Sequence, residues 1–314
     1  FDGIKKLPAE YVGMKKELLL QWMAESQMLV KANVRLNDAA IQVSEWFRKK
    51  GFRTCILKGQ GNALMYPNPY SRTPGDIDIW VEGGDKRVIS FVRSISPHEK
   101  ACYHHIEFPS YKGVEVEVHY RPSFLLCFWH NRKLQKYYER VKEEQFSHRV
   151  MLGEQGEIAI PTAEFNLIFQ LTHIYAHLMN EGIGLRQLLD YYYVLISDDL
   201  LLIRDRVQKE LKELGSWKFA GAIMYIMQEV FGMPASRLIV PPNEKYGKFV
   251  LNEVLEAGNF GKHDARNQFG RSKFGHNLQR VYRDIRLVRY FPAEALCEPL
   301  FRVWHFFWRL KYKK

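Results

Sequence analysis

Valine recurs at every second position between charged residues over residues 113–119. This two-residue period predicts a half-buried strand with Glu115, Glu117 and His119 on one face, because successive side chains of a strand point to opposite sides. The preceding stretch, residues 101–108, also has an extended pattern. We predict that the two stretches form a hairpin closed by the four residues between Phe108 and Gly113.

A second short apolar alternation follows Gly75, and it predicts a strand through Val81. Asp76 and Asp78 fall on one face of this strand, whereas Ile77 and Ile79 face the other side. Two carboxylates so close repel each other unless a cation lies between them. Mg²⁺, or Mn²⁺, takes oxygen ligands and also binds substrate phosphates. The alternative is that the two aspartates form the solvated face of an edge strand.

Upstream, residues 55–57 form an apolar run that predicts a buried strand. Gly59 and Gly61 allow a tight turn after it, and a helix is predicted to begin near Asn62. A strand, a glycine turn and a helix N-terminus together aim backbone N–H groups at one point, where a phosphate can bind. Lys58 adds a positive charge there. A turn without a ligand is the simpler alternative.

The loop over residues 67–74 is rich in proline and contains Arg72. Arg72 either neutralises a phosphate, pairs with one of the aspartates, or is an exposed loop arginine. Helical periodicity over residues 8–50 and 85–95 predicts two helices that pack on the sheet.

After residue 122 the pattern becomes helical. The predicted helices cover residues 131–145, 162–180, 185–196, 200–214 and 216–231, and more follow the break at Pro241-Pro242. We therefore predict an α/β (α+β) chain. A mixed sheet with flanking helices occupies residues 1–125, and a helical domain occupies residues 126–314.

Two pairs in the helical half are spaced four residues apart, which places each pair on one helix face. His173 and His177 have a spacing that can bind a metal, but no nearby glutamate or third histidine completes a site in the sequence, so core histidines are the alternative. Arg186 and Asp190 form an ion pair in the simplest interpretation. Arg186 instead reaches a nucleotide phosphate if its helix caps the cleft.

The composition narrows the class of protein. A chain of 314 residues with 46% hydrophobic and 26% charged residues predicts two globular domains. No apolar run is long enough to span a membrane, and the first residues lack the apolar block of a signal peptide. Four scattered cysteines have no zinc-type spacing, which favours a reduced, cytoplasmic protein.

A net charge of +11 favours an acidic partner such as nucleotide, RNA or anionic lipid. The last residues, 301–314, combine aromatic side chains with basic residues and no acid. Such a segment binds nucleic acid, lies at a membrane surface, or docks its aromatic side chains on the core.

The order of glycine turn, helix, Asp-x-Asp strand and acidic strand resembles the polymerase β-like nucleotidyltransferase superfamily. More narrowly, the chain resembles a bacterial family of uncharacterised nucleotidyltransferases that also has a helical second half. The matching residues are Leu57-Lys58-Gly59, Arg72, Gly75-Asp76-Ile77-Asp78 and Glu117-Val118-His119-Tyr120, with residues 173–177 and 184–190 in the helical half. The resemblance implies that Asp76 and Asp78 are paired metal ligands and that Glu117 is the third carboxylate.

We therefore predict a metal-dependent nucleotidyltransferase that moves a nucleoside monophosphate from NTP to an acceptor hydroxyl and releases pyrophosphate. Lys58, the turn Gly59-Gln60-Gly61 and Arg72 would bind the triphosphate, and the acceptor is a small molecule, an RNA end or a protein side chain. Asp76→Asn and Asp78→Asn are both expected to leave the fold intact, since each removes repulsion.

Two alternatives remain at this stage. Active superfamily members usually carry Gly-Ser or Gly-Gly at the phosphate turn, so Gly59-Gln60-Gly61 also fits a module that binds nucleotide without turnover. An Asp-x-Asp pair also fits a transferase that uses a nucleotide-sugar and Mn²⁺.

Overall fold

The computed structural model describes residues 13, 15–154, 156–196, 200–258, 264, 266 and 273–312. The chain divides into two compact units. The first comprises Phe1–Glu99, Ile106–Tyr120 and Phe146–Pro161, and the second comprises Lys100–His105, Arg121–Gln145 and Thr162–Lys314. The units therefore do not coincide with the two continuous segments, 1–125 and 126–314, that the sequence predicts.

The first unit is a mixed α/β structure. Its elements are α2 (Lys16–Lys49), β1 (Thr54–Ile56), α3 (Gln60–Ala63), η2 (Pro69–Ser71), β2 (Ile77–Val81), α4 (Gly84–Ile95), β3 (His105–Tyr111), β4 (Val114–His119), β5 (Arg149–Met151) and β6 (Glu157–Ala159). Two of the crossings between units fall inside elements, after the first residue of β3 and near the end of the helix that precedes β5. The predicted helices over residues 8–50 and 85–95 are confirmed within the described residues.

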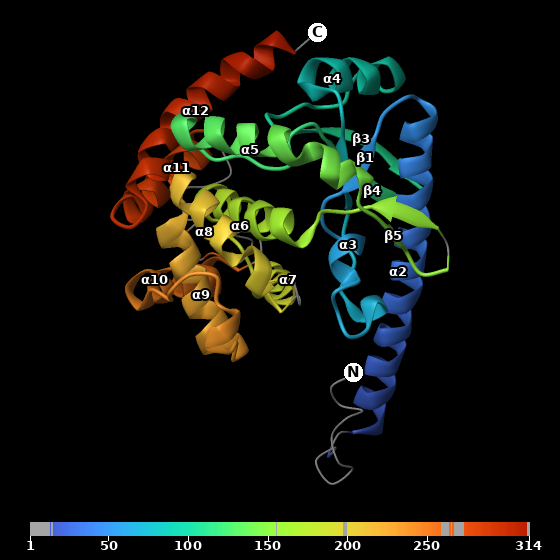
Figure 1. Cartoon of the computed structure of the whole chain (residues 1–314), viewed down its shortest axis with the longest axis horizontal. Coiled ribbons are helices and arrows are strands. Elements are labelled where there is room, and N and C mark those ends of the chain that lie inside the picture. Colours follow the sequence, from blue (N-terminus) through green and yellow to red (C-terminus); the bar gives the residue numbers. More distant parts are fainter. Residues whose placement is uncertain are drawn as a thin grey trace. The chain divides into compact units, whose positions relative to one another are not determined.

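Four strands form one sheet in the order β1-β2-β4-β3. The central strand β2 is antiparallel to β1, pairing Ile79 with Ile56, and parallel to β4, pairing Ile79 with Val118. Every residue of β2 is buried. The long helix α2 lies along this sheet (Figure 1). A mixed sheet with flanking helices is thus confirmed.

The hairpin between β3 and β4 closes later than the sequence predicts. The turn consists of Lys112 and Gly113, which both have positive φ, 51° and 74°. Two-residue hairpin turns favour this left-handed conformation because it matches the twist of the strands. Pro109 therefore lies within β3, where its missing N–H is tolerated because β3 is at the edge of the sheet.

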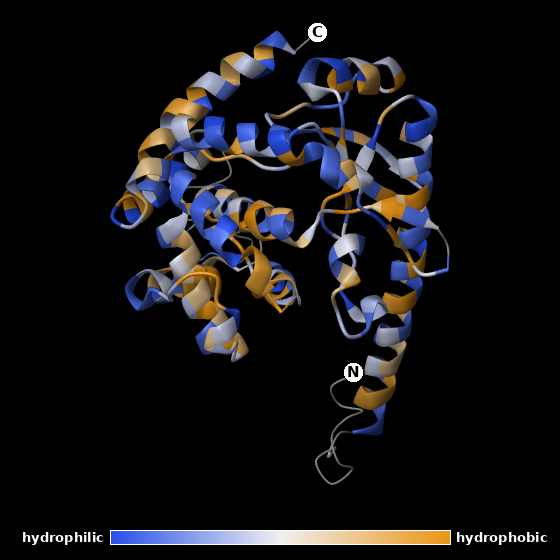
Figure 2. Ribbon diagram, in the orientation of Figure 1, coloured by the Kyte–Doolittle hydropathy of each residue, from blue (hydrophilic) through white to orange (hydrophobic). Residues whose placement is uncertain are grey.

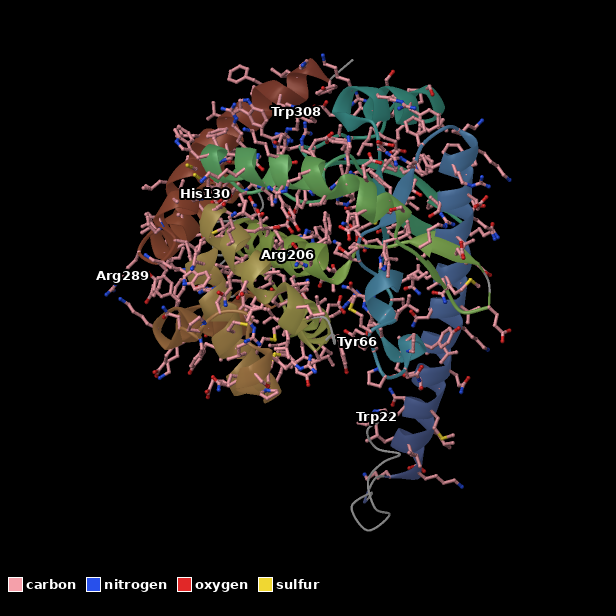
Figure 3. All side chains as sticks on the ribbon, in the orientation of Figure 1. Trp22, Tyr66, His130, Arg206, Arg289 and Trp308 are labelled. Atoms are coloured by element: carbon pink, nitrogen blue, oxygen red, sulfur yellow. The ribbon has the colours of Figure 1, made fainter. Side chains whose placement is uncertain are left out.

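The helix α2 is buried over only part of its length. Its buried residues begin at Asn33, and the stretch before it exposes apolar side chains such as Met28, which is 62% exposed. Figure 3 shows Trp22 on this N-terminal stretch. Only the C-terminal part of α2 packs on the sheet, and it ends in an aromatic cluster around Phe47.

One hairpin is absent from the sequence prediction. The strands β5 and β6 have three residues each and pair Val150 with Ile158. Strands this short carry too few residues to show a two-residue period. Ile160, directly after β6, packs beside Gly61, where a Cβ atom would lie 3.1 Å from Ile160 Cγ2. The segment that follows β6 therefore packs against the turn Gly59-Gln60-Gly61.

The second unit is mainly helical. Its elements are α5 (Phe128–Ser147), α6 (Ala163–Asn180), α7 (Leu185–Leu195), α8 (Leu200–Glu213), α9 (Trp217–Phe231), η3 (Ala235–Arg237), α10 (Glu244–Ala257), α11 (Lys273–Val288) and α12 (Pro292–Lys311). The five helices predicted between residues 131 and 231 are confirmed. None of the helices in the described part of the chain is apolar over a stretch long enough to cross a bilayer.

The basic-aromatic C-terminal segment lies mostly in α12. Phe301 is buried and stacks on Phe124 at a ring distance of 5.3 Å. Phe306 and Phe307 remain exposed, and Figure 2 shows hydrophobic and hydrophilic stretches alternating along this helix. The helix thus docks some of its aromatic side chains and presents others to solvent.

Substitution of Phe47 would test how α2 packs on the sheet. Phe47 is fully buried against Phe52, Phe91 and Phe108, with ring distances of 5.6–6.2 Å. We expect Phe47→Ala to lower the free energy of unfolding by about 3–5 kcal/mol in urea denaturation, because it leaves a cavity. Met28→Ala on the same helix is the control and should change it by less than about 0.5 kcal/mol. Similar losses in both variants would contradict this packing.

Candidate functional site

Three carboxylates meet at the start of β2. The parallel register places Glu117 of β4 directly beside Asp78 of β2. Asp76 lies just before the strand and is more exposed than Asp78, which is 3% exposed. One oxygen from each of the three side chains lies within 4.8 Å of the other two. The structure therefore brings together the three acidic residues that the sequence singled out.

Two positively charged side chains converge on one oxygen of Asp78. Lys58 Nζ lies 3.0 Å from Asp78 Oδ1, and His119 Nε2 lies 2.9 Å from the same atom. His119 is 1% exposed, and its Nε2 also lies 3.4 Å from Glu117 Oε2. The imidazole thus bridges the two strands, and Asp78 is held by groups from both of its neighbouring segments.

The charges of these groups depend on one another. Burial acts to raise the pKa of Asp78, but the Lys58 ammonium and the hydrogen bond from His119 outweigh it and hold the pKa below its usual value. Burial acts in the opposite sense on His119, yet its contacts with Asp78 and Glu117 raise its pKa to about 9. At neutral pH the imidazole is therefore protonated, and Nε2–H donates to Asp78.

The neighbouring negative charges affect the pKa of Asp76 most strongly. Repulsion from Asp78 is the largest cause, followed by burial, and together they raise the pKa of Asp76 from 3.8 to about 6. Lys58 acts in the other direction without cancelling them. A cation bound nearby would stabilise the ionised form of this carboxylate, and such a raised pKa is typical of a cation site.

The glycine turn adjoins this cluster. Gly59 has φ 56° and ψ −109°, and a Cβ atom there would lie 3.4 Å from the carbonyl oxygen of Asp76. The Leu57 N–H donates to the Asp78 carbonyl at 2.9 Å, which ties the segment before Lys58 to β2. The helix that follows, α3, has four residues and begins at Gln60, two residues before the predicted start near Asn62.

Gln60 does not direct its side chain toward the carboxylates. Its Nε2 donates to Asn37 Oδ1 on α2, and the residue is 2% exposed. Asn33, one turn earlier on α2, donates from Nδ2 to the carbonyl oxygens of Tyr70 and Arg72 at 2.9 and 2.8 Å. The two asparagines therefore fix the turn and the proline-rich loop.

Both asparagines were absent from the sequence prediction. A single asparagine on the buried face of a helix belongs to no recognisable sequence motif. The available signal was that Asn33 and Asn37, two polar residues, are spaced four apart on that face. The predicted phosphate ligand Arg72 is 6% exposed, so the alternative of an exposed loop arginine is wrong. Its guanidinium donates to the Thr73 carbonyl at 3.3 Å.

Arg186 lies in the second unit. It is exposed in the first turn of α7, and Asp190 is buried on the same helix. Its role toward a nucleotide stays a prediction.

The donor set of the acidic cluster fits a divalent cation. Three carboxylates supply the hard oxygen ligands that Mg²⁺ and Mn²⁺ prefer, and the raised pKa of Asp76 shows that the cluster has an excess of negative charge. Asp76, Asp78 and Glu117 would hold the ion.

The family comparison agrees with this arrangement. A family model described as "Uncharacterised nucleotidyltransferase" matches residues 3–232. The chain belongs to this family. Membership supports a general role in nucleotidyl transfer, with an NTP as substrate and a divalent metal as the usual cofactor of such enzymes.

Other comparisons add little to the nucleotidyltransferase assignment. No curated protein matches the chain. One matching solved structure is an antigenic nucleotidyltransferase-like protein from Paracoccidioides brasiliensis, with 14% identity over 58% of this chain and 90% of that chain. Its TM-score is 0.32.

The two aspartates should respond oppositely to neutralisation, which corrects the expectation that both changes leave the fold intact. Asp78→Asn leaves Lys58 and His119 without their shared carboxylate in a buried site. We expect it to lower the free energy of unfolding by about 3 kcal/mol, measured by urea denaturation at pH 7 without divalent metal. An unchanged stability would contradict the pairing.

Asp76→Asn should stabilise the metal-free protein at neutral pH. The pKa of Asp76 is higher in the folded protein, about 6, than its usual 3.8, so folding favours the protonated form. Its contribution is fully favourable below about pH 4 and is lost as the pH rises through about 6. At pH 7 to 8 the variant should gain about 1 kcal/mol, since solvent screens this side chain, and the gain should vanish near pH 4. A gain independent of pH would contradict the assignment.

Proposed function

We propose that this nucleotidyltransferase moves a nucleoside monophosphate from an NTP to an acceptor hydroxyl and releases pyrophosphate, at the cluster of Asp76, Asp78 and Glu117. The observation that carries the proposal is the parallel pairing of β2 with β4, which sets Glu117 beside Asp78 at the point where Asp76 enters the sheet. Three carboxylates gathered from separate stretches of chain supply the ligands of a cation site.

Mg²⁺ or Mn²⁺ bound there would neutralise the triphosphate and make the attacking hydroxyl more acidic. Phosphoryl-group transfer depends mainly on positioning and on charge stabilisation, so the protein's own contribution is to fix these groups. His119 and Lys58 restrain Asp78 from two sides. His119 is a positioning residue, because it acts through Asp78, and Lys58 would both hold Asp78 and supply charge to the triphosphate.

Glu117 is the best placed proton acceptor. Its side chain is 35% exposed, whereas those of Asp78 and His119 are almost fully buried. A carboxylate that reaches solvent can accept the proton of an incoming hydroxyl, provided the hydroxyl comes within hydrogen-bond distance. Glu117 thereby serves either as a metal ligand or as the general base.

The triphosphate would lie toward the turn Gly59-Gln60-Gly61, with Lys58 and Arg72 supplying positive charge. Gly59 supports this placement because its lack of a side chain keeps the backbone close to Asp76. Gln60 contributes through its backbone only, since its amide group bonds to α2. Cys55, Cys102, Cys127 and Cys297 form no disulfide with one another, which fits a reducing compartment such as the cytoplasm.

A second candidate is a module that binds NTP without turnover. The observation that favours it is the shortness of α3, which has four residues and offers a phosphate little of the helix dipole. The acceptor then plays no part, and the nucleotide acts through contacts with a partner.

The test is incubation of the purified protein with Mg²⁺ or Mn²⁺, each labelled NTP and a panel of small-molecule, RNA and protein acceptors. Asp76→Asn should lower the rate of pyrophosphate release at least about 100-fold, since it removes a ligand from a centre worth several kcal/mol. Glu115→Gln is the control, because Glu115 is an exposed acid of β4, the strand that carries Glu117. Its rate should equal that of the wild type.

Two outcomes would decide against turnover at this cluster. NTP binding that depends on metal, with no pyrophosphate released to any acceptor, would establish the binding module. Equal losses in Asp76→Asn and Glu115→Gln would show that general negative charge, and not the cluster, is responsible.

A further inference from the structure

The second unit contains a cavity of about 340 Å³ that the proposed transfer reaction does not use. Its wall includes the segment Cys102–His105 and parts of α6, α11 and α12. The described lining includes five histidines, at positions 104, 105, 173, 177 and 305, together with one cysteine. Histidine and cysteine at this density are the side chains that bind transition metals.

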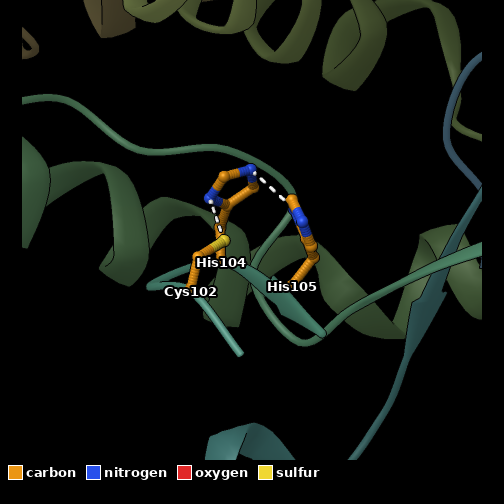
Figure 4. A group of neighbouring side chains, drawn as sticks. All are labelled: Cys102, His104 and His105. Atoms are coloured by element: carbon orange, nitrogen blue, oxygen red, sulfur yellow. Dashed lines mark hydrogen bonds between the residues drawn. The ribbon is translucent and has the colours of Figure 1, made fainter. Parts of the chain in front are cut away.

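Three of these side chains form one cluster. Cys102 Sγ lies 3.4 Å from His104 Nδ1, and His104 Nε2 lies 3.0 Å from His105 Nδ1 (Figure 4). One ligand atom from each of Cys102, His104 and His105 lies within 4.8 Å of the other two. The Cys102 N–H also donates to the His105 carbonyl at 2.9 Å, so a tight backbone turn holds the three residues together.

We propose that Cys102, His104 and His105 bind a zinc-class divalent cation at the wall of this cavity. A thiolate and two imidazoles are a ligand set that suits Zn²⁺, and the thiolate neutralises part of its charge. Bond lengths of about 2.3 Å to sulfur and about 2.0–2.1 Å to nitrogen imply ligand separations of about 3.3–3.5 Å. The contacts of His104 with Cys102 and with His105 are near these separations, and one ligand atom from each of the three residues lies within 4.8 Å of the others.

Binding requires a small adjustment. His104 contacts its two neighbours through opposite ring nitrogens, and one ion takes only one nitrogen from each ring. A rotation of the His104 ring replaces its two hydrogen bonds by one metal bond. The fourth position of a tetrahedral site is then available to water or to a ligand in the cavity, as in zinc sites that have three protein ligands.

The same cavity has a second histidine pair, which sets up a control. His173 Nε2 and His177 Nε2 lie 3.0 Å apart on one face of α6, and Glu181 Oε2 lies 3.5 Å from His177 Nδ1. The sequence interpretation that no glutamate lies near this pair is wrong, since Glu181 contacts His177, but it does so through Nδ1 and not through the Nε2 that faces His173. The pair offers two imidazoles and no thiolate, whereas the Cys102 cluster offers three ligands, so the cluster is the stronger site.

Another cysteine-containing group is explained by packing. Cys127, His130 and Glu294 also lie within ligand distance of one another. Glu294 Oε2 accepts from the backbone N–H groups of Leu126 and Cys127 at 2.6 and 3.0 Å, and Glu294 Oε1 lies 3.0 Å from His130 Nδ1. Glu294 therefore holds the start of α5, and its oxygens are already engaged by protein groups.

The test uses the full chain stripped of metal with a chelator and then titrated with Zn²⁺ by calorimetry and with Co²⁺ by absorption. We expect one tightly bound Zn²⁺ and, with Co²⁺, a near-ultraviolet thiolate band, which an ion held by the carboxylates of Asp76, Asp78 and Glu117 does not produce. Cys102→Ser should remove this band and weaken Zn²⁺ binding by at least about 100-fold, since even outer-shell changes cost 10–100-fold. His105→Gln should weaken binding similarly, and it serves as a second variant if the first folds poorly.

Two controls locate the ion. The double variant His173→Asn/His177→Asn and the single variant Cys127→Ala should both keep the band and the affinity. The proposal is overturned if Cys102→Ser keeps the band, if either control loses it, or if the wild-type protein binds no stoichiometric ion. Each readout is independent of NTP turnover, so failure here leaves the proposed transfer reaction untouched.

Discussion

The buried carboxylate of Asp78 is the constraint on which the candidate site depends. A carboxylate that is 3% exposed stays ionised only if positive charge compensates for lost solvation, and Lys58 and His119 supply it at 3.0 and 2.9 Å. The same compensation fixes the position of the side chain. Asp76 and Glu117 then share what negative charge remains, and a divalent cation is the natural complement.

The sequence predicted the site best where acidic residues lie within a regular hydrophobic alternation. The alternation around residues 114–118 gave both the strand β4 and the face that carries Glu117, and the short apolar runs gave β1 and β2. The five helices predicted between residues 131 and 231 were found within a few residues of their ends because each has a long helical pattern. The family resemblance then added the roles of the carboxylates.

Other features could not be read from the sequence. The parallel pairing of Asp78 with Glu117 joins strands that are far apart in the chain, so only the fold defines it. The sequence does not tell whether Lys58 contacts a phosphate or a carboxylate, because a lysine binds either anion. In the structure it contacts the carboxylate of Asp78. Likewise Cys102 joins His104 and His105 only because a backbone turn brings their side chains together, a relation that residue spacing alone leaves open.

The arrangement of charge on β4 bears on how the sheet assembles. Glu117 and His119 are two residues apart on one face, and at neutral pH the imidazole is protonated. His119 gains this charge through pairing, because the contacts with Asp78 that raise its pKa form only when β4 lies beside β2. Lys58, two residues beyond the end of β1, reaches the same oxygen of Asp78. Docking of β4 beside β2 at neutral pH is thus coupled to uptake of a proton by His119, and this proton compensates part of the charge of the carboxylates.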